Sequence, residues 1–313
     1  MNSFCTIITN DYLPFARALH HSLIALDPTA ELQVLVVDGP ENLSVEPGMK
    51  LYNAQSILSS PLAEKIYRKY SAMDRDSLRW ALKPVFLNYL LEKGFSKLIY
   101  VDPDIFFVGD FSFLWEELDS KHILLTPHWT EPTPETDEEN FLMSFRIGLF
   151  NAGFIGVNKK GSPALQWWAE ACMYAIHKNE DKAMYDDQRW LDMMPVLFPE
   201  TGIVLHKGCN LGSWNIHSNK RIVRNEQVLI NGEYPVIFIH FNHETIKHIL
   251  NGNDGALRPY FDEYQKLFGR EGLGNYVPKL NDWKNSNFFK QVKRKTRFRT
   301  RIKNWLFRLS QKL

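Results

Sequence analysis

The sequence predicts an α/β protein with a largely parallel β-sheet. In the first hundred residues, short apolar runs typical of strands alternate with longer runs whose apolar residues recur at helical spacing. Strands and helices that alternate at these lengths indicate β-α-β units. The composition, 44% hydrophobic and 23% charged residues over 313 positions, is that of an ordinary globular protein. No run of about 18 apolar residues is present that would span a bilayer.

The elements of the first half follow from their own patterns. We expect strands at 4–9 (FCTIIT), 32–37 (LQVLVV) and 97–101 (KLIYV), and helices at 13–26 and 77–94. Pro84 lies inside the second helical pattern. Because proline lacks a backbone N–H donor, we expect a kink or an earlier break of the helix there.

The second half has a more mixed pattern. Its expected strands are 122–128, 148–158, 202–205 and 234–241, and its expected helices are 161–178 and 184–194. The acidic, proline-containing stretch 130–140 (TEPTPETDEEN) is predicted to be a loop. Residues 1–270 are therefore predicted to form one α/β domain, and residues 271–313 a C-terminal extension.

Two carboxylates follow the predicted strand 97–101, in the stretch YVDPDIFF. Asp102 and Asp104 are expected at the carboxyl end of that strand, where a parallel sheet binds its ligands. Carboxylates separated by one residue can both face one hard cation, which in turn binds the oxygens of a diphosphate. Asp74 and Asp76 have the same spacing, but a helical pattern follows them and no strand precedes them, so we predict that they start a helix.

Further motifs occur in a fixed order around this pair. They are TIITNDYLPFARAL at 6–19, LFNAGFIGVN at 149–158, YDDQRWLD at 185–192 and IFIHFNHE at 237–244. Because of these motifs, the stretch 3–250 resembles glycosyltransferases of the GT-A fold. It is most similar to the family-8 group, which includes glycogenin and bacterial lipopolysaccharide galactosyltransferases. The resemblance implies the GT-A (nucleotide-diphospho-sugar transferase) fold, a mixed but mainly parallel central sheet flanked by helices. Its nucleotide-binding half would span about 1–110 and its sugar and acceptor half 111–270.

The resemblance also implies which residues contact the nucleotide sugar. A polar turn after the first strand would hold the nucleoside, a basic residue before the Asp-x-Asp pair would lie beside the diphosphate, and a lysine near the end of the domain would contact it too. The corresponding residues are Thr9, Asn10, Asp11, Tyr12, Lys83 with Arg79 as the alternative, Asp102, Pro103, Asp104 and Lys247. Lys247 departs from the family pattern, since it lies seven residues after His240 and not six.

Other residues are assigned to the transferred sugar, the metal and the acceptor. The resemblance implies that Asn151, Asp187 and Gln188 lie near the transferred sugar. It also implies that Asp102, Asp104 and His240 bind Mn²⁺ or Mg²⁺, with His243 as a rival third ligand. Trp214, in a loop beside Asn215 and His217, is a candidate for stacking on an acceptor sugar.

The implied reaction is transfer of a hexose from a nucleotide-diphosphate sugar, with UDP as the expected nucleotide, to a hydroxyl of a glycan or lipid-linked glycan. Such a reaction suits synthesis of a surface polysaccharide such as lipopolysaccharide. Retention of configuration is implied, either through a nucleophile such as Asp187 or through same-face attack assisted by the leaving phosphate. The alternatives are a nucleotidyltransferase of similar fold and a catalytically silent nucleotide- or glycan-binding module.

The C-terminal end carries a separate charge. Between Lys290 and Leu313 there are ten basic residues and no acidic one. The whole sequence has 37 basic residues, so residues 1–289 contain 27 basic and 36 acidic residues and carry a net charge of about −9 by formal count. Apolar residues of 288–313 recur at roughly helical spacing, which suits a basic amphipathic helix on an anionic membrane surface. The alternatives are a solvated terminus and a segment that binds nucleic acid. The net negative charge of residues 1–289 argues against nucleic-acid binding. The N-terminus lacks a signal-peptide pattern, so we expect a cytoplasmic protein at the inner face of the cell membrane.

Overall fold

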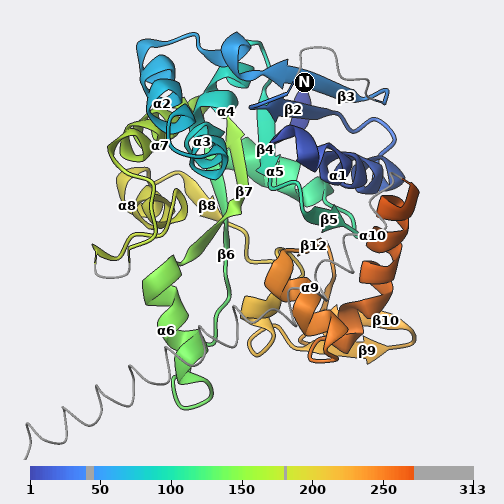
Figure 1. Cartoon of the computed structure of the whole chain (residues 1–313). Helices are drawn as coiled ribbons and strands as arrows, with labels where there is room; N and C mark the ends of the chain where they lie inside the picture. The colour runs from blue at the N-terminus through green and yellow to red at the C-terminus, as the bar shows by residue number, and fades with distance from the viewer. Residues whose placement is uncertain (40–45, 180–181, 271–313) are drawn as a thin grey trace, which may run out of the picture. The chain divides into compact units, whose positions relative to one another are not determined.

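A seven-stranded mixed sheet forms the centre of the computed structural model, which describes residues 1–39, 46–179 and 182–270 (Figure 1). Its strand order is β3-β2-β1-β4-β7-β6-β8. The strands are β1 (Asn2–Ile8), β2 (Leu32–Val36), β3 (Met49–Asn53), β4 (Lys97–Val101), β6 (Ile123–Pro127), β7 (Phe150–Asn158) and β8 (Thr201–Ile203). β7 runs antiparallel to both of its neighbours, β4 and β6, and the other pairs are parallel. The predicted mixed, mainly parallel sheet is confirmed.

Helices cover both faces of this sheet. Alternate side chains of β1 point to opposite faces: Cys5 and Ile7 belong to one buried cluster, and Phe4 and Ile8 to the other. The first cluster includes residues of α2, α3, α4 and α7, and the second includes residues of α1 and α5, as their positions in Figure 1 show. These helices are α1 (Leu13–Leu26), α2 (Pro61–Ser71), α3 (Arg75–Ala81), α4 (Lys83–Glu92), α5 (Ser112–Ser120) and α7 (Ser162–Tyr174).

The predicted helix 77–94 is broken into α3 and α4, and Leu82 caps both. Pro84 lies in the first turn of α4, where its missing N–H donor has no helical acceptor to lose. The expectation of a break near Pro84 is therefore confirmed. Its consequence is that Lys83 begins a new helix, with its side chain buried against the sheet.

Two small sheets complete the strands. β9 (Arg221–Arg224), β10 (Gln227–Ile230) and β11 (Tyr234–Pro235) form an antiparallel sheet. β5 (Ile105–Phe107) pairs antiparallel with β12 (Phe238–His240), and His240 lies opposite Ile105. The predicted strand 234–241 is thus two strands that belong to different sheets. The second of them brings His240 next to the residues that precede β5.

The remaining elements are shorter. The predicted loop 130–140 ends where Asp137 caps α6, and the predicted helix 184–194 is mostly the 3-10 helix η5. These and the other elements are α6 (Glu138–Ile147), α8 (Met194–Leu197), α9 (His243–Leu250), α10 (Arg258–Arg270), η1 (Asn10–Tyr12), η2 (Ala54–Ile57), η3 (Lys159–Gly161), η5 (Gln188–Met193), η6 (Ser213–Asn215) and η7 (Gly255–Leu257).

Residues Met1–Leu267 form one compact unit. Within the described ranges, no helix combines the length and the hydropathy needed to cross a membrane. The predicted basic helix at 288–313 lies outside the described residues.

Candidate active site

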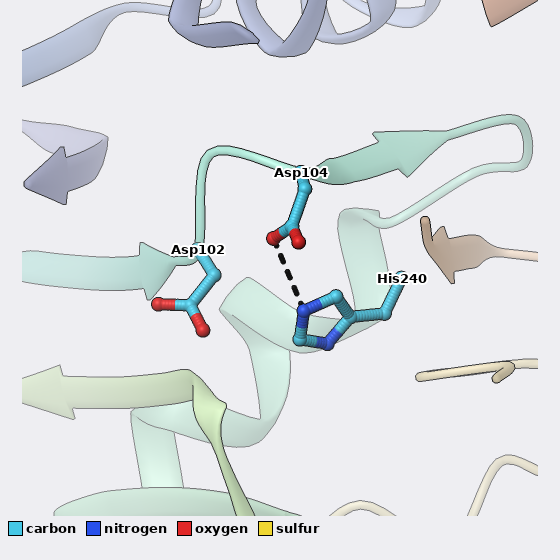
Figure 2. A group of neighbouring side chains, drawn as sticks. All are labelled: Asp102, Asp104 and His240. Carbon is cyan, nitrogen blue, oxygen red and sulfur yellow. Dashed lines mark ion pairs between the residues drawn. The ribbon is translucent and has the colours of Figure 1, made fainter. Parts of the chain in front are cut away.

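Two aspartates and a histidine converge at the carboxyl end of β4. Asp102 follows β4, Asp104 precedes β5, and His240 ends β12, the partner strand of β5 (Figure 2). The His240 Nε2 atom lies 3.1 Å from Asp104 Oδ1. One ligand atom from each of these residues lies within 4.8 Å of the other two. Of the two histidines predicted as third ligand, His240 belongs to this group and His243, the first residue of α9, does not.

Gly153 forms one wall of this group. Because β7 is antiparallel to β4, its beginning lies beside the end of β4, and the Gly153 carbonyl accepts a hydrogen bond from the Asp102 N–H at 2.9 Å. A Cβ atom at Gly153 would lie 2.7 Å from His240 Cε1 and 3.0 Å from Asp102 Oδ2. The missing side chain therefore leaves open a space beside Asp102 and His240.

The donor atoms in this space fit a divalent cation. Two carboxylates and one imidazole nitrogen suit Mn²⁺, and Mg²⁺ accepts the nitrogen less readily. The Tyr100 hydroxyl donates to Asp102 Oδ1 at 2.8 Å, which orients that carboxylate. Asp102, Asp104 and His240 are therefore the residues that would hold the metal.

Lys83 carries a buried positive charge beside the group. Its ammonium lies 3.3 Å from Asp102 Oδ1 and 3.1 Å from Asp187 Oδ2, and it donates to the Ala152 carbonyl at 3.0 Å. The side chains of Lys83 and Asp187 are only 3% and 4% exposed. Lys83 thus connects α4, the end of β4, β7 and the start of η5. The family resemblance implied this residue, with Arg79 as the alternative.

The charges of these residues support one another. Burial alone would lower the pKa of Lys83, but Asp102 and Asp187 outweigh it and raise that pKa above its ordinary value, so the ammonium stays charged. Burial raises the pKa of Asp187 to about 6, and the attraction of Lys83 opposes this rise. Burial also opposes the charges of Asp104 and His240, yet their pairing lowers the pKa of Asp104 and raises that of His240.

Asn151 and Gln188 both form hydrogen bonds with backbone groups at the beginning of β7. Asn151 Oδ1 accepts from the Gly153 N–H at 2.6 Å. Gln188 Oε1 accepts from the Ala152 N–H at 3.1 Å, and its Nε2 donates to the Ile147 carbonyl at 2.8 Å. Both amides therefore fix the first residues of β7 next to Asp102, Asp104 and His240, which are called the metal group below.

The predicted nucleoside turn directly follows β1. Thr9 is buried and caps η1, and the Asn10 N–H donates to Asp38 Oδ1 at 2.7 Å. The Arg79 guanidinium lies 4.9 Å from the centre of the Tyr12 ring and pairs with Asp76 at 2.5 Å. The turn is thus joined to α3, and Arg79 supplies a second positive charge on the side of the site that faces α3.

The predicted acceptor residues have different surroundings. The Trp214 ring is buried and meets the His240 ring edge-on, with 5.4 Å between centroids. Asn215 is fully buried, and its amide is used inside the protein: Nδ2 donates to the His128 and Asn210 carbonyls. His217 is exposed and lies 3.2 Å from Asp137 Oδ2, so it joins this loop to the start of α6.

Lys247, predicted to contact the diphosphate, lies on α9 and is partly exposed. Its ammonium pairs with Glu244 Oε2 at 3.0 Å.

Three residues of the site were not predicted from the sequence. Tyr100 was detectable, because a residue two positions before Asp102 on a strand shares its face. His128 follows β6 and packs its ring 5.8 Å from that of Trp214. Arg221, at the start of β9, contacts the loop that contains Trp214, but it belongs to no motif of the sequence.

No family model matches the sequence. The chain is 26% identical over 247 residues to the uncharacterized protein YfnF of Bacillus subtilis (strain 168), which covers 77% of this chain and 81% of that protein. It is 30% identical over 175 residues to YfnD, a second uncharacterized protein of that strain, over 53% of each chain. Among solved structures, the galactosyltransferase LgtC in complex with donor and acceptor sugar analogs has a TM-score of 0.55 at 17% identity, and the match covers 86% of this chain and 96% of LgtC. Together with the sheet order and the site at its edge, this similarity shows that the chain has the GT-A fold predicted from its motifs.

Proposed function

We propose that the protein is a metal-dependent glycosyltransferase. It would transfer a hexose from a nucleotide-diphosphate sugar, with UDP-sugars as the first donors to test, to a hydroxyl of a glycan or a lipid-linked glycan. Retention of the anomeric configuration is part of the proposal. So is a role in building a surface polysaccharide such as lipopolysaccharide, on the cytoplasmic face of the membrane.

The observation that carries this proposal is the convergence of Asp102, Asp104 and His240 beside the buried Lys83. A nucleotide diphosphate bears negative charge that grows on the leaving group during transfer. A divalent cation held by the three ligands supplies Lewis-acid stabilisation of that charge. Lys83 adds a fixed ammonium whose protonation is secured by its two carboxylate partners.

The other residues of the site fix the position of β7 and of the Lys83 ammonium. Gln188 and Asn151 hold the beginning of β7 against the metal group, and Asp187 holds Lys83. Because Asp187 is buried and paired, its first effect is to fix the ammonium. The LgtC structure holds donor and acceptor sugar analogs, which supports a test of both substrate classes here.

The experiment is a donor screen followed by a turnover assay. Thermal unfolding is measured with Mn²⁺ and a set of nucleotide sugars, because a bound ligand raises the melting temperature by mass action. Release of nucleoside diphosphate from the stabilising donor is then measured. Asp102→Asn and Asp104→Asn should abolish that release, whereas Asp74→Asn, in the pair of equal spacing that starts α3, should leave it unchanged.

Three results would count against the proposal. Undiminished turnover in Asp102→Asn and Asp104→Asn would exclude the metal-dependent mechanism. Release of pyrophosphate in place of nucleoside diphosphate would indicate a nucleotidyltransferase, and tight UDP binding without turnover would indicate a silent binding module.

A further inference from the structure

The loop of residues 208–221 forms the support behind His240. The His240 N–H donates to the Leu211 carbonyl at 2.9 Å, and the Leu211 N–H donates to the Phe238 carbonyl at 3.2 Å. The Trp214 ring of the same loop meets the imidazole of His240 at 84°. Both the backbone and the ring of His240 are therefore positioned by this loop.

Little regular structure stabilises the 208–221 loop itself. Its described elements are the 3-10 helix η6 and a single bridge between Leu211 and Ile239. The Trp214 ring folds back over Gly212, where a Cβ atom would lie 2.6 Å from Trp214 Cζ2. The position of the indole thus depends on the loop backbone keeping this conformation.

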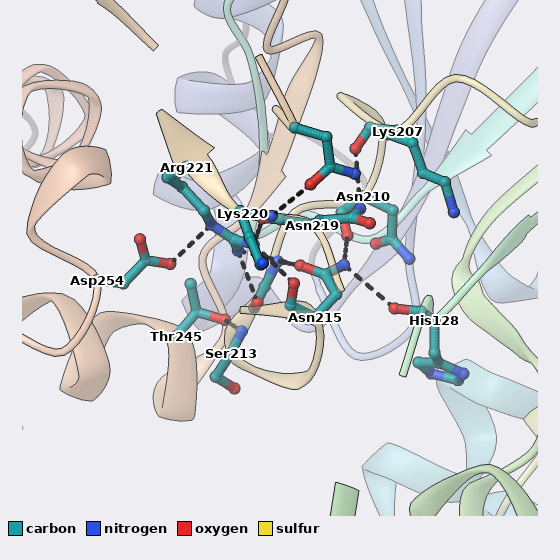
Figure 3. Close-up of polar contacts among 12 residues, drawn as sticks. His128, Lys207, Asn210, Ser213, Asn215, Asn219, Lys220, Arg221, Thr245 and Asp254 are labelled. Atoms are coloured by element: carbon teal, nitrogen blue, oxygen red, sulfur yellow. Dashed lines mark hydrogen bonds and ion pairs between the residues drawn. The ribbon is translucent and has the colours of Figure 1, made fainter. Parts of the chain in front are cut away.

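Arg221, at the start of β9, holds that backbone (Figure 3). Its Nη1 donates to the carbonyls of Asn215 at 2.8 Å and Asn219 at 2.5 Å. Its Nη2 donates to the Gly212 carbonyl and to Asn215 Oδ1, both at 3.0 Å. One guanidinium therefore joins acceptors on both sides of Trp214, which a planar group with five donors can do and a lysine ammonium cannot.

Asp254 fixes the guanidinium from the other side. Its Oδ2 lies 3.2 Å from Arg221 Nε, and the two side chains are 3% and 4% exposed. A buried ion pair is a poor source of stability, because the loss of hydration offsets much of the attraction. What the pair provides here is a fixed direction for the remaining donors of Arg221.

We infer that Arg221, held by Asp254, is a positioning residue that sets the place of His240 in the metal group through the 208–221 loop. The inference rests on the proposed function, because it concerns the affinity of the site for its cation. The hydrogen bonds and the ion pair of Arg221 go to Gly212, Asn215, Asn219 and Asp254 and to none of the three ligands, so it acts on His240 through the loop. Residues that orient metal ligands from behind typically change metal affinity by about 10- to 100-fold when they are replaced.

The test measures binding of Mn²⁺ alone, by electron paramagnetic resonance, to the nucleotide-free full chain. Arg221→Lys keeps the charge next to Asp254 but loses most of the loop acceptors, and we expect its Kd for Mn²⁺ to rise about tenfold or more. Gly212→Ala keeps every contact of Arg221 but displaces the indole, and it should weaken Mn²⁺ binding similarly. If Arg221→Lys does not fold, Gly212→Ala decides the outcome.

A matched control separates positioning from simple loss of stability. Ile66→Ala removes a buried side chain of α2, which packs in a different part of the core. It should lower the melting temperature while the Kd for Mn²⁺ stays that of the wild type, with all proteins assayed well below their melting temperatures.

The outcomes distinguish the inference from the proposed function. Wild-type affinity for Mn²⁺ in both Arg221→Lys and Gly212→Ala would overturn the inference alone. An equal loss of affinity in Ile66→Ala would also overturn it, since stability would then explain the effect. Absence of Mn²⁺ binding by the wild type, or unchanged binding in Asp102→Asn, would overturn the metal site and the inference with it.

Discussion

Asp102 and Asp74 each begin an Asp-x-Asp pair, and the groups around them give the two pairs different roles. Asp74 accepts hydrogen bonds at 2.7 Å from both the N–H and the hydroxyl of Ser77, as a helix cap does, and these bonds lower its pKa. Asp102 and Asp104 instead face each other and His240. Spacing alone does not separate the pairs. The strand before Asp102 does, and for this reason the sequence predicts a cation site at Asp102 and Asp104 and a helix start at Asp74 and Asp76.

Gly153 leaves no room for an added methyl group beside Asp102 and His240. In Gly153→Ala, the new Cβ would crowd Asn151 Oδ1, His240 and Asp102, so the metal ligands must move apart. We expect Mn²⁺ affinity to fall about tenfold or more, measured by titration with the metal alone. Gly255→Ala, where a Cβ meets no atom within 4 Å, should bind Mn²⁺ like the wild type. Equal affinities in the two variants would contradict the tight geometry described here.

His128 should make stability depend on pH. Its Nδ1 lies 2.9 Å from the Gly148 carbonyl, and burial lowers its pKa to about 4, so it is neutral in the folded protein at neutral pH. In the unfolded chain its pKa is about 6.5. Because the unfolded state then binds the proton more readily, this group's contribution is fully present above about pH 6.5 and is lost as the pH falls toward 4, by about 3 kcal/mol in all.

The measurement is urea unfolding at several pH values between about 7 and 4.5. His128→Asn keeps a donor for the Gly148 carbonyl but does not titrate, so its free energy of unfolding should fall less steeply as the pH is lowered. Titratable groups that do not interact with His128 contribute equally to both proteins and cancel in the comparison. Parallel pH profiles would show that His128 does not titrate as described.

At the scale of elements, the antiparallel insertion of β7 builds the site. It places Asn151 and Gly153, at the beginning of a strand, beside Asp102 at the end of another. The sequence predicted both strands and a mixed, mainly parallel sheet. It did not show which strand runs antiparallel, because strand direction depends on the neighbours that a strand meets, and no local pattern records that. Likewise, 234–241 reads as one apolar strand, and only the pairing with β5 shows that His240 belongs to a second sheet.

The break between α3 and α4 was predictable, because proline constrains the backbone locally. The contacts of Arg221 were not, because they join the 208–221 loop to Asp254 and follow no period. Asp102, Asp104 and His240 could be predicted as ligands because each belongs to a motif that lies at the end of a strand. The residues that support them from behind carry no such signal.

Lys83 shows how one side chain joins several elements. Lys83→Met would leave the buried Asp187 without its cation and remove a partner of Asp102, which we expect to cost about 3–5 kcal/mol of unfolding free energy. In the double variant Lys83→Met/Asp187→Asn the unpaired charge is gone, so part of that loss should be recovered. Urea unfolding of the four proteins of this cycle provides the test. A double variant less stable than Lys83→Met alone would show that Asp187 matters for a reason other than its charge.

At the scale of the whole molecule, charge is divided between the two ends of the sequence. Residues 1–289 carry a formal charge of about −9, and residues 290–313 carry ten basic residues and no acidic one. An anionic membrane would repel the first part and attract the second. We therefore propose that the C-terminal segment, which lies outside the described residues, brings the enzyme to the surface where a lipid-linked acceptor is embedded.

Removal of 288–313 should abolish sedimentation with vesicles of anionic lipid and leave turnover on a soluble acceptor unchanged. Each basic residue near such a surface contributes about 1 kcal/mol, so ten of them are sufficient for binding without a spanning helix. Because this attraction is screened over about 10 Å at 0.1 M salt, binding of the full chain should weaken as salt is added and should be absent with neutral vesicles. Equal sedimentation of the full and shortened chains would place the membrane contact on the folded unit. A parallel loss of turnover on the soluble acceptor would instead assign the segment to the catalytic unit itself.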